Sequence, residues 1–172
     1  MKVFCEEDVD FGGWIVIQRR QNGIVDFNRD WHDYKEGFGD LTGNYWIGLE
    51  KLHALTSSCE QELYIQLKRL NGTEYYAKYS AFVIANETEG YALKKLGVER
   101  RLVVPRLLSQ VKTFCLSECV MIYRLFYSFL NGVYGHSVNW NTIQKEETLS
   151  FAQMMIRPNT QCIRRLMLSN LN

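Results

Sequence analysis

Residues 12–40 decide the fold of this protein, and they read GGWIVIQRRQNGIVDFNRDWHDYKEGFGD. After the glycine pair, residues 14–20 are apolar and β-branched, which predicts a buried β-strand. A short amphipathic helix is expected next, because Asn28 is a suitable N-cap, Asp30 suits the first turn and Gly37 is a natural helix end. The stretch therefore predicts a strand followed by a helix.

The segments that follow alternate between helical and strand patterns. Leucines at 49, 52 and 55 predict a second short helix. Residues 62–70 and 74–84 are two strand-like runs on either side of Asn71-Gly72, the strongest short-range signal for a β-hairpin. With two prolines and no low-complexity linker, we expect one domain that mixes helices and strands.

Composition excludes several classes of protein. The formal net charge of +1 offers no electrostatic footprint for nucleic acid. Apolar runs are far shorter than the roughly 20 residues of a membrane-spanning helix, so no membrane insertion is expected. The N-terminus MKVFCEEDVDFGG turns acidic where a signal peptide would be apolar, so no signal peptide is visible.

Cysteines and sequons bear on the cellular compartment. Five cysteines are an odd number, so in a secreted protein at least one would lack a partner within the molecule. Asn71 and Asn86 each begin an Asn-x-Thr sequon and are the predicted glycosylation sites if the protein enters the secretory pathway.

Catalytic and metal-binding patterns are weak. The three histidines lie in different elements without a nucleophile or paired carboxylates, so we expect no enzyme. Cys115 and Cys119 could join His136 or Cys162 on zinc, but structural zinc sites usually show tighter, doubled spacings.

These segments, in this order, resemble the fibrinogen-like C-terminal domain shared by fibrinogens, ficolins, tachylectins, tenascins and angiopoietins. The matching positions are Trp14, Val16, Gln18, Arg19, Arg20, Asp26, Phe27, Trp31, Tyr34, Gly37, Phe38, Gly39, Trp46, Gly48 and His53. The resemblance implies an α+β fold with a central twisted antiparallel sheet and short flanking helices. It implies a single domain over residues 1–158, matched at 3–97 and 128–158, and an extra tail at 159–172.

Residues 98–127 depart from the family pattern. Family members bind calcium through an Asp-x-Asp loop here, but this sequence has no aspartate between 98 and 129, so we expect no cofactor. Codons AGG AGA CTN for Arg100-Arg101-Leu102 would read Gly-Asp-Ser, a family motif, one nucleotide later. A shifted reading frame, a mis-joined exon, a splice form and true divergence all remain open.

The resemblance also assigns cysteines and a ligand pocket. Cys5 and Cys119 resemble family bridge positions; the partner of Cys5 is expected upstream of Met1, and that of Cys119 is missing. Cys162 has no family counterpart. The family pocket carries over to Tyr123, Asn131, Tyr134 and Trp140, whose aromatic faces and donors suit a sugar.

Two functions follow from the resemblance. The first is a secreted, lectin-like recognition module for N-acetylated sugars or an extracellular protein, with a role in innate immunity, and homo-oligomeric in the full-length parent protein. The second is a decayed or truncated paralogue that lacks the calcium site and pocket and serves structural association only.

Overall fold

The computed structural model describes residues 1–22, 24–27, 29–69, 71–102 and 149–163. The elements, in sequence order, are β1 (Phe4–Glu6), β2 (Trp14–Arg20), α1 (Trp31–Glu36), β3 (Phe38–Gly39), β4 (Tyr45–Trp46), α2 (Leu49–Ser58), β5 (Gln61–Arg69), β6 (Glu74–Ile84), the 3-10 helix η1 (Glu87–Glu89), β7 (Leu93–Leu96), β8 (Glu99–Leu102) and β9 (Leu149–Pro158).

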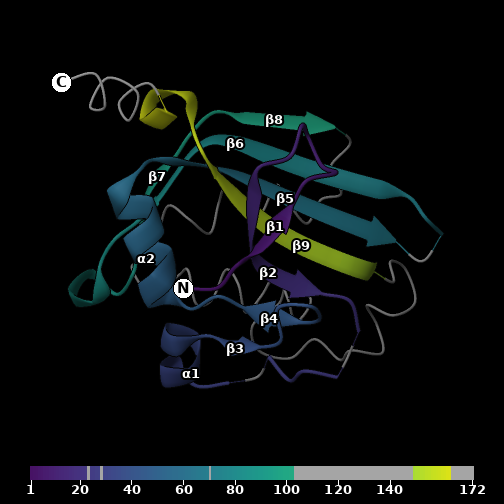
Figure 1. Ribbon diagram of the computed structural model, residues 1–172, viewed down its shortest axis with the longest axis horizontal. Helices are drawn as coiled ribbons and strands as arrows, with labels where there is room; N and C mark the ends of the chain where they lie inside the picture. The colour runs from purple at the N-terminus through teal and green to yellow at the C-terminus, as the bar shows by residue number, and fades with distance from the viewer. Residues whose placement is uncertain (23, 28, 70, 103–148, 164–172) are drawn as a thin grey trace, which may run out of the picture.

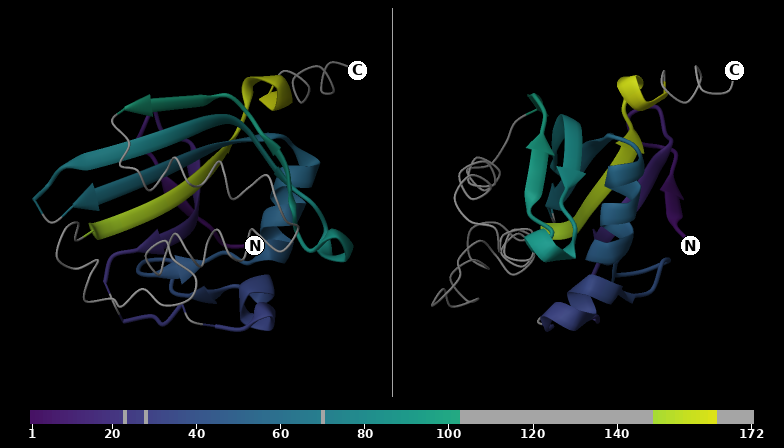
Figure 2. Two further views of the ribbon diagram at one scale, coloured as in Figure 1. Left: turned by 180° about the vertical axis from the view of Figure 1, so that it is seen from behind. Right: turned by 90° about the vertical axis from the view of Figure 1, so that its left-hand side faces the viewer.

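The described strands form one nine-stranded antiparallel sheet accompanied by short helices, which confirms the expected fold class. The strand order is β3-β4-β2-β9-β5-β6-β7, with β1 paired to β2 and β8 paired to β6. Figure 1 shows β9 in the middle of the sheet although it is the last of these strands in the sequence. The left view of Figure 2 shows α1 and α2 gathered at one end of the long strands.

Aromatic residues of the opening stretch, together with Trp46 on β4, form the core beside β2. Trp14 and Tyr34 are completely buried, and Phe27 and Trp46 are nearly so. The Trp46 indole N–H donates to the carbonyl of Tyr34 at 2.7 Å, and the Tyr34 hydroxyl donates to the carbonyl of Phe27 at 2.8 Å. Because the polar tips of Trp46 and Tyr34 both have partners, these large rings enter the core without the cost of an unsatisfied donor.

Helix α1 starts later than the sequence predicted. The N-cap is Asp30, not Asn28, and its carboxylate accepts the backbone N–H of Asp33 at 3.0 Å. Asp30 has the extended backbone that an N-cap requires, whereas Asn28 lies outside the described residues. Gly37 ends the helix as predicted. The predicted second helix is confirmed as α2 and extends to Ser58.

The predicted hairpin is confirmed by β5 and β6, whose pairing begins next to the turn with Lys68 opposite Glu74. On β5 the apolar side chains Leu63, Ile65 and Leu67 are almost fully buried on one face, while on the other face Tyr64 is buried and Gln66 is half-buried. This alternation sets the register, since a slip of one residue would turn all three toward the other face of the sheet.

Two arginines at the end of β2 carry their charge into the interior. The Arg19 guanidinium lies 3.9 Å from the centre of the Phe4 ring and donates to the Gln153 side chain at 2.6 Å. Arg20 lies 4.3 Å from the centre of the Phe27 ring. Burial lowers the pKa of both guanidinium groups, although arginine stays charged over any physiological range. Arg19 thus links β2 to both β1 and β9.

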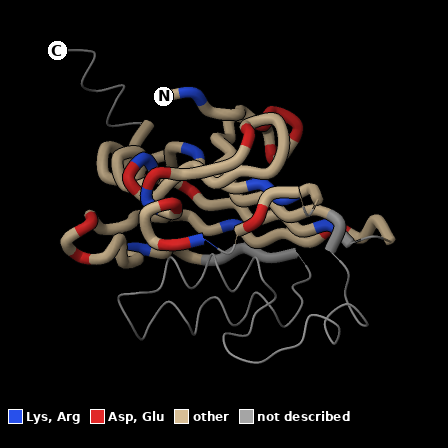
Figure 3. Tube along the Cα trace, turned by 90° about the horizontal axis from the view of Figure 1, so that it is seen from below, with Lys and Arg blue, Asp and Glu red and all other residues tan. Residues whose placement is uncertain are grey.

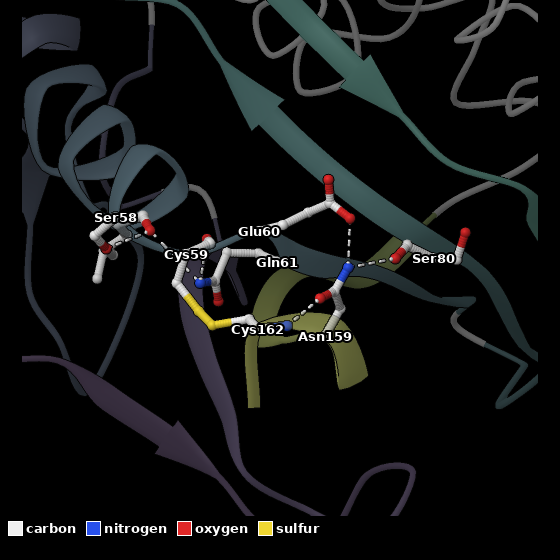
Figure 4. The surroundings of a disulfide bond; sticks show 8 residues. Ser58, Cys59, Glu60, Gln61, Ser80, Asn159 and Cys162 are labelled. Carbon is white, nitrogen blue, oxygen red and sulfur yellow. Dashed lines mark hydrogen bonds between the residues drawn. A yellow bond between two sulfur atoms is a disulfide. The ribbon is translucent and has the colours of Figure 1, made fainter. Parts of the chain in front are cut away.

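A disulfide joins Cys59, at the end of α2, to Cys162, just past β9, with a Cα–Cα distance of 5.6 Å (Figure 4). Asn159 supports the same junction: its side chain accepts the Cys162 N–H at 3.0 Å and donates to Glu60 at 2.6 Å and to the Ser80 carbonyl at 3.3 Å. The first residues of the predicted tail therefore pack onto the domain. This bond removes Cys162 from the weaker zinc alternative.

We expect Cys162→Ser to lower the free energy of unfolding by about 2–5 kcal/mol, because the disulfide closes a long loop in the unfolded state. The bonded cysteines are 103 residues apart. Thermal unfolding with and without reductant measures the effect, and Cys5→Ser is the matched control because the Cys5 thiol is free and exposed. Equal stabilities of wild type and Cys162→Ser would contradict the expectation.

Candidate functional site

The residues assigned by the sequence, from motifs or from resemblance, fall into two groups. The pocket residues Tyr123, Asn131, Tyr134 and Trp140, together with Cys119, lie outside the described residues. The three other assigned positions are described and exposed: Asn71 in the β5–β6 turn, Asn86 at the start of η1, and Cys5 on β1. Modification of Asn71 and Asn86 stays a prediction.

The described surface feature with the most unusual backbone is loop 7–13, between β1 and β2. Four consecutive residues have positive φ: Asp10 at 45°, Phe11 at 69°, Gly12 at 74° and Gly13 at 75°. Glycine adopts this conformation freely, but for aspartate and phenylalanine it costs on the order of 1 kcal/mol or more each. Such strain persists only where other contacts hold the backbone in place.

Arg157, on β9, supplies those contacts. One terminal nitrogen of its guanidinium donates to the carbonyls of Asp10 and Gly12, both at 2.9 Å, on either side of Phe11. The other terminal nitrogen lies 3.1 Å from the Asp10 carboxylate and 2.9 Å from the Glu62 carboxylate. A planar guanidinium can satisfy several acceptors at once, which makes it suited to this role.

Lys78 completes a four-charge cluster with Asp10, Glu62 and Arg157. Its ammonium lies 2.7 Å from Asp10 and 3.4 Å from Glu62. The four side chains are between 19% and 27% exposed, so their attraction is only partly screened by water. Two cations balance two carboxylates, and the cluster fixes loop 7–13 across β5, β6 and β9.

Aromatic rings lie beneath this cluster. The Arg157 guanidinium is 4.1 Å from the centre of the Trp14 ring, and the Trp14 and Tyr64 ring centres are 5.3 Å apart. Tyr64 also stacks on Tyr76 at 5.2 Å. Burial, followed by the neighbouring Tyr76 and Asp10, raises the pKa of Tyr64 to about 12, so its phenol is neutral at physiological pH.

Phe11 is held completely exposed by this arrangement. A turn alone would be formed better by glycine at this position, since phenylalanine adds both backbone strain and exposed apolar surface. Strained residues of this kind cluster at ligand-binding loops. Phe11 is therefore a candidate contact residue that the sequence analysis missed; the signal in the sequence was a large apolar residue between Asp10 and a glycine pair.

Other kinds of site find little support in the described part of the molecule. Figure 3 shows basic and acidic residues interspersed along the tube. Among the described residues, no group of three histidine, cysteine or carboxylate side chains is placed to hold a metal ion. No described helix is long and apolar enough to cross a membrane.

Comparison with known proteins identifies the family. The family model for the C-terminal globular domain of fibrinogen beta and gamma chains matches residues 1–100. The protein belongs to this family. It is 34% identical over 184 residues to human angiopoietin-4, a match that spans 91% of this protein and 37% of that one. It is 48% identical over 93 residues to ryncolin-4 of Cerberus rynchops, which spans 54% of this protein and 27% of that one.

Solved structures show the same fold. The fibrinogen-like globe domain of human ANGPTL6 aligns with a TM-score of 0.69 and 31% identity, over 92% of this protein and 83% of that one. A lamprey fibrin D-dimer complexed with the peptide Gly-His-Arg-Pro-amide aligns with a TM-score of 0.62 and 25% identity, over 91% and 64%. The expected family and fold are thereby confirmed. The division into matched and divergent segments stays a prediction.

We expect Phe11→Gly to change the free energy of unfolding by less than about 1 kcal/mol, because relief of backbone strain offsets the added freedom of the unfolded state. Gly12→Ala should instead destabilise the domain by about 1–3 kcal/mol. A Cβ at Gly12 would lie 2.5 Å from the Glu7 carboxylate and 2.9 Å from the Glu7 carbonyl oxygen. Denaturant unfolding compares the two, and the reverse order would disprove this account of the loop.

Arg157→Lys keeps the positive charge but removes the guanidinium that binds the carbonyls of Asp10 and Gly12. We therefore expect it to lower the free energy of unfolding by about 2–3 kcal/mol. Lys68→Ala is the matched control. It removes the exposed ion pair to Glu74, worth about 1 kcal/mol or less. Denaturant unfolding measures both variants, and equal effects would show that the cluster holds the loop no better than a surface pair does.

Proposed function

We propose that this domain is a secreted, non-enzymatic recognition module that binds a carbohydrate with N-acetyl groups or an extracellular protein. The observation that carries the proposal is membership of a family in which a fibrin relative is complexed with the peptide Gly-His-Arg-Pro-amide. The domain spans 37% or less of the curated relatives described above. We therefore propose that the domain is part of a longer protein that forms homo-oligomers, in which several weak binding sites together would give higher avidity.

Two structural features support secretion. Disulfides form and persist in oxidising compartments and are rare in the cytosol, and the Cys59–Cys162 bond is well placed to be structural. The sequons at Asn71 and Asn86 lie on exposed turns, where an oligosaccharide can be attached without disturbing the core.

The ligand is proposed to bind at Tyr123, Asn131, Tyr134 and Trp140, with Phe11 as a separate contact for a protein ligand. An aromatic face against sugar C–H groups combined with an amide donor suits an N-acetylated sugar. Phe11 suits an apolar pocket on a protein, since exposed aromatic side chains on rigid loops make low-entropy contacts. An innate-immune role would follow from recognition of foreign sugars.

The alternative is a decayed paralogue that no longer binds a ligand. It is favoured by the absence of aspartate between residues 98 and 129, where family members hold calcium. Sequencing the transcript across codons 96 to 131 separates the two. A second frame that encodes Gly-Asp-Ser and an Asp-x-Asp loop favours recognition, and confirmation of the sequence as written favours decay.

Retention of the whole protein on N-acetylglucosamine resin, in calcium and in chelator, tests sugar binding directly. The sequence lacks the family's calcium loop, so we expect retention in both buffers. Tyr134→Ala should weaken it about tenfold, because one aromatic contact with the sugar is lost. Ile24→Ala is the matched control, since it removes an exposed apolar side chain between β2 and α1. Titration with Gly-His-Arg-Pro-amide tests peptide binding in parallel.

Folded protein that is neither retained on the resin nor bound by the peptide would favour the decayed paralogue. Thermal unfolding of the same sample shows that it is folded, so that a negative result is not a consequence of misfolding.

A further inference from the structure

We propose that Asn71 is a site of spontaneous deamidation, at the exposed tip of the β5–β6 hairpin. The backbone nitrogen of Gly72 attacks the side-chain carbonyl carbon of Asn71 and closes a five-membered succinimide ring. The bond from that carbon to the amide nitrogen breaks, and ammonia leaves with the proton that Gly72 gives up. Water then opens the ring to aspartate or isoaspartate, so asparagine and water become an acidic residue and ammonia.

The turn presents the reacting groups favourably. The Asn71 side-chain oxygen accepts the backbone N–H of Thr73 at 2.9 Å. This Asx-turn folds the side chain back along the Gly72 peptide, and the hydrogen bond polarises the carbonyl that is attacked. All three residues are exposed, so water reaches the ring.

Gly72 removes the steric barrier to ring closure. It has no side chain that could shield its nitrogen from the Asn71 carbonyl carbon. A Cβ built at this position would meet no atom within 4 Å apart from its chain neighbours, so the surroundings leave the turn open. Its φ of 83° is one that residues with a side chain rarely adopt, so glycine is the residue the turn requires. The glycine at position 72 thus both favours the hairpin turn and leaves Asn71 open to attack.

The sequence holds two further Asn-Gly pairs, and the one at Asn22 provides an internal comparison, while the one at Asn131 lies outside the described residues. Asn22 forms the same Asx-turn, with its side-chain oxygen accepting the backbone N–H of Ile24 at 3.1 Å, but that oxygen also accepts the side-chain amide of Asn44. Asn44 is buried and is itself fixed by the backbone N–H groups of Gln21 and Asn22, at 2.6 and 3.2 Å. Ring closure at Asn22 must break the hydrogen bond to the buried Asn44, so Asn71 should react first.

Asn86 is protected for another reason. It is followed by Glu87, whose side chain hinders attack by the backbone nitrogen, and its own side-chain oxygen is engaged by Thr88 and by the N–H of Glu89 at 2.8 and 3.2 Å. Of the two sequons, therefore, only the one at Asn71 is also a deamidation site.

The reaction would change the hairpin chemically. A new carboxylate at 71 adds negative charge beside the exposed Lys68–Glu74 pair, and isoaspartate also lengthens the backbone of the turn by one carbon. The nitrogen lost as ammonia is the atom to which an N-linked glycan would be attached. Glycosylation and deamidation of Asn71 therefore exclude each other.

The test is incubation of the unglycosylated whole protein, made in bacteria and refolded with its disulfide, at neutral and at mildly acidic pH. Peptide mapping by mass spectrometry follows the exchange of the amide NH₂ for OH at each asparagine, and isoaspartyl methyltransferase detects isoaspartate. We expect conversion at Asn71 several times faster than at Asn22. The rate should rise with pH, because the deprotonated Gly72 nitrogen is the nucleophile.

Two variants and one synthetic peptide test why Asn71 should react faster than Asn22. Asn71→Gln should abolish the signal at this peptide, because a glutamine would have to close a six-membered ring. Asn44→Ala should speed conversion at Asn22 by releasing its side chain. A synthetic peptide of residues 66–78 reports the rate without the fold. Conversion at Asn22 ahead of Asn71, or Asn71 far slower in the folded protein than in the peptide, would overturn the proposal.

Discussion

The pairing of β9 between β2 and β5 is the constraint on which the rest of the described structure depends. Nearly the whole strand is paired with β5, from Gln61 to Arg69, and its central residues 152–156 are also paired with β2, from Ile15 to Arg20. Among the described strands, the two halves of the sheet meet only through β9. Residues more than 120 positions apart in the sequence must therefore come together before the core around Trp14 can close, which is typical of slow, non-local β topologies.

β9 and the residues just after it also carry the two features that fix the ends of the domain. Arg157 reaches from this strand to hold loop 7–13, and Cys162, a few residues later, bonds Cys59 at the end of α2. The first is a network of charged hydrogen bonds and the second is covalent, so they respond to different conditions. Salt and acid act on the former, whereas only reduction acts on the latter.

The loop and the hairpin show two uses of strained or permissive backbone. Phe11 keeps a positive φ although it is a large residue, because Arg157 holds the carbonyls on either side of it, and its ring is exposed. At Gly72 positive φ costs nothing, but the missing side chain leaves the neighbouring asparagine chemically open. In both places the local geometry matters for chemistry more than for the stability of the core.

The sequence by itself determined the family, the strand at 14–20, the β5–β6 hairpin and α2, because these follow from local periodicity, turn chemistry and a run of motif residues. It placed the cap of α1 two residues early, since asparagine and aspartate are equally good caps by composition and only the backbone at Asp30 separates them. Tertiary structure alone decided the Cys59–Cys162 bond and the exposure of Phe11. The spacing of cysteines in a sequence does not show which of them are bonded. Phe11 is exposed because Arg157 holds loop 7–13, and these residues are about 150 positions apart, so no local sequence pattern links them.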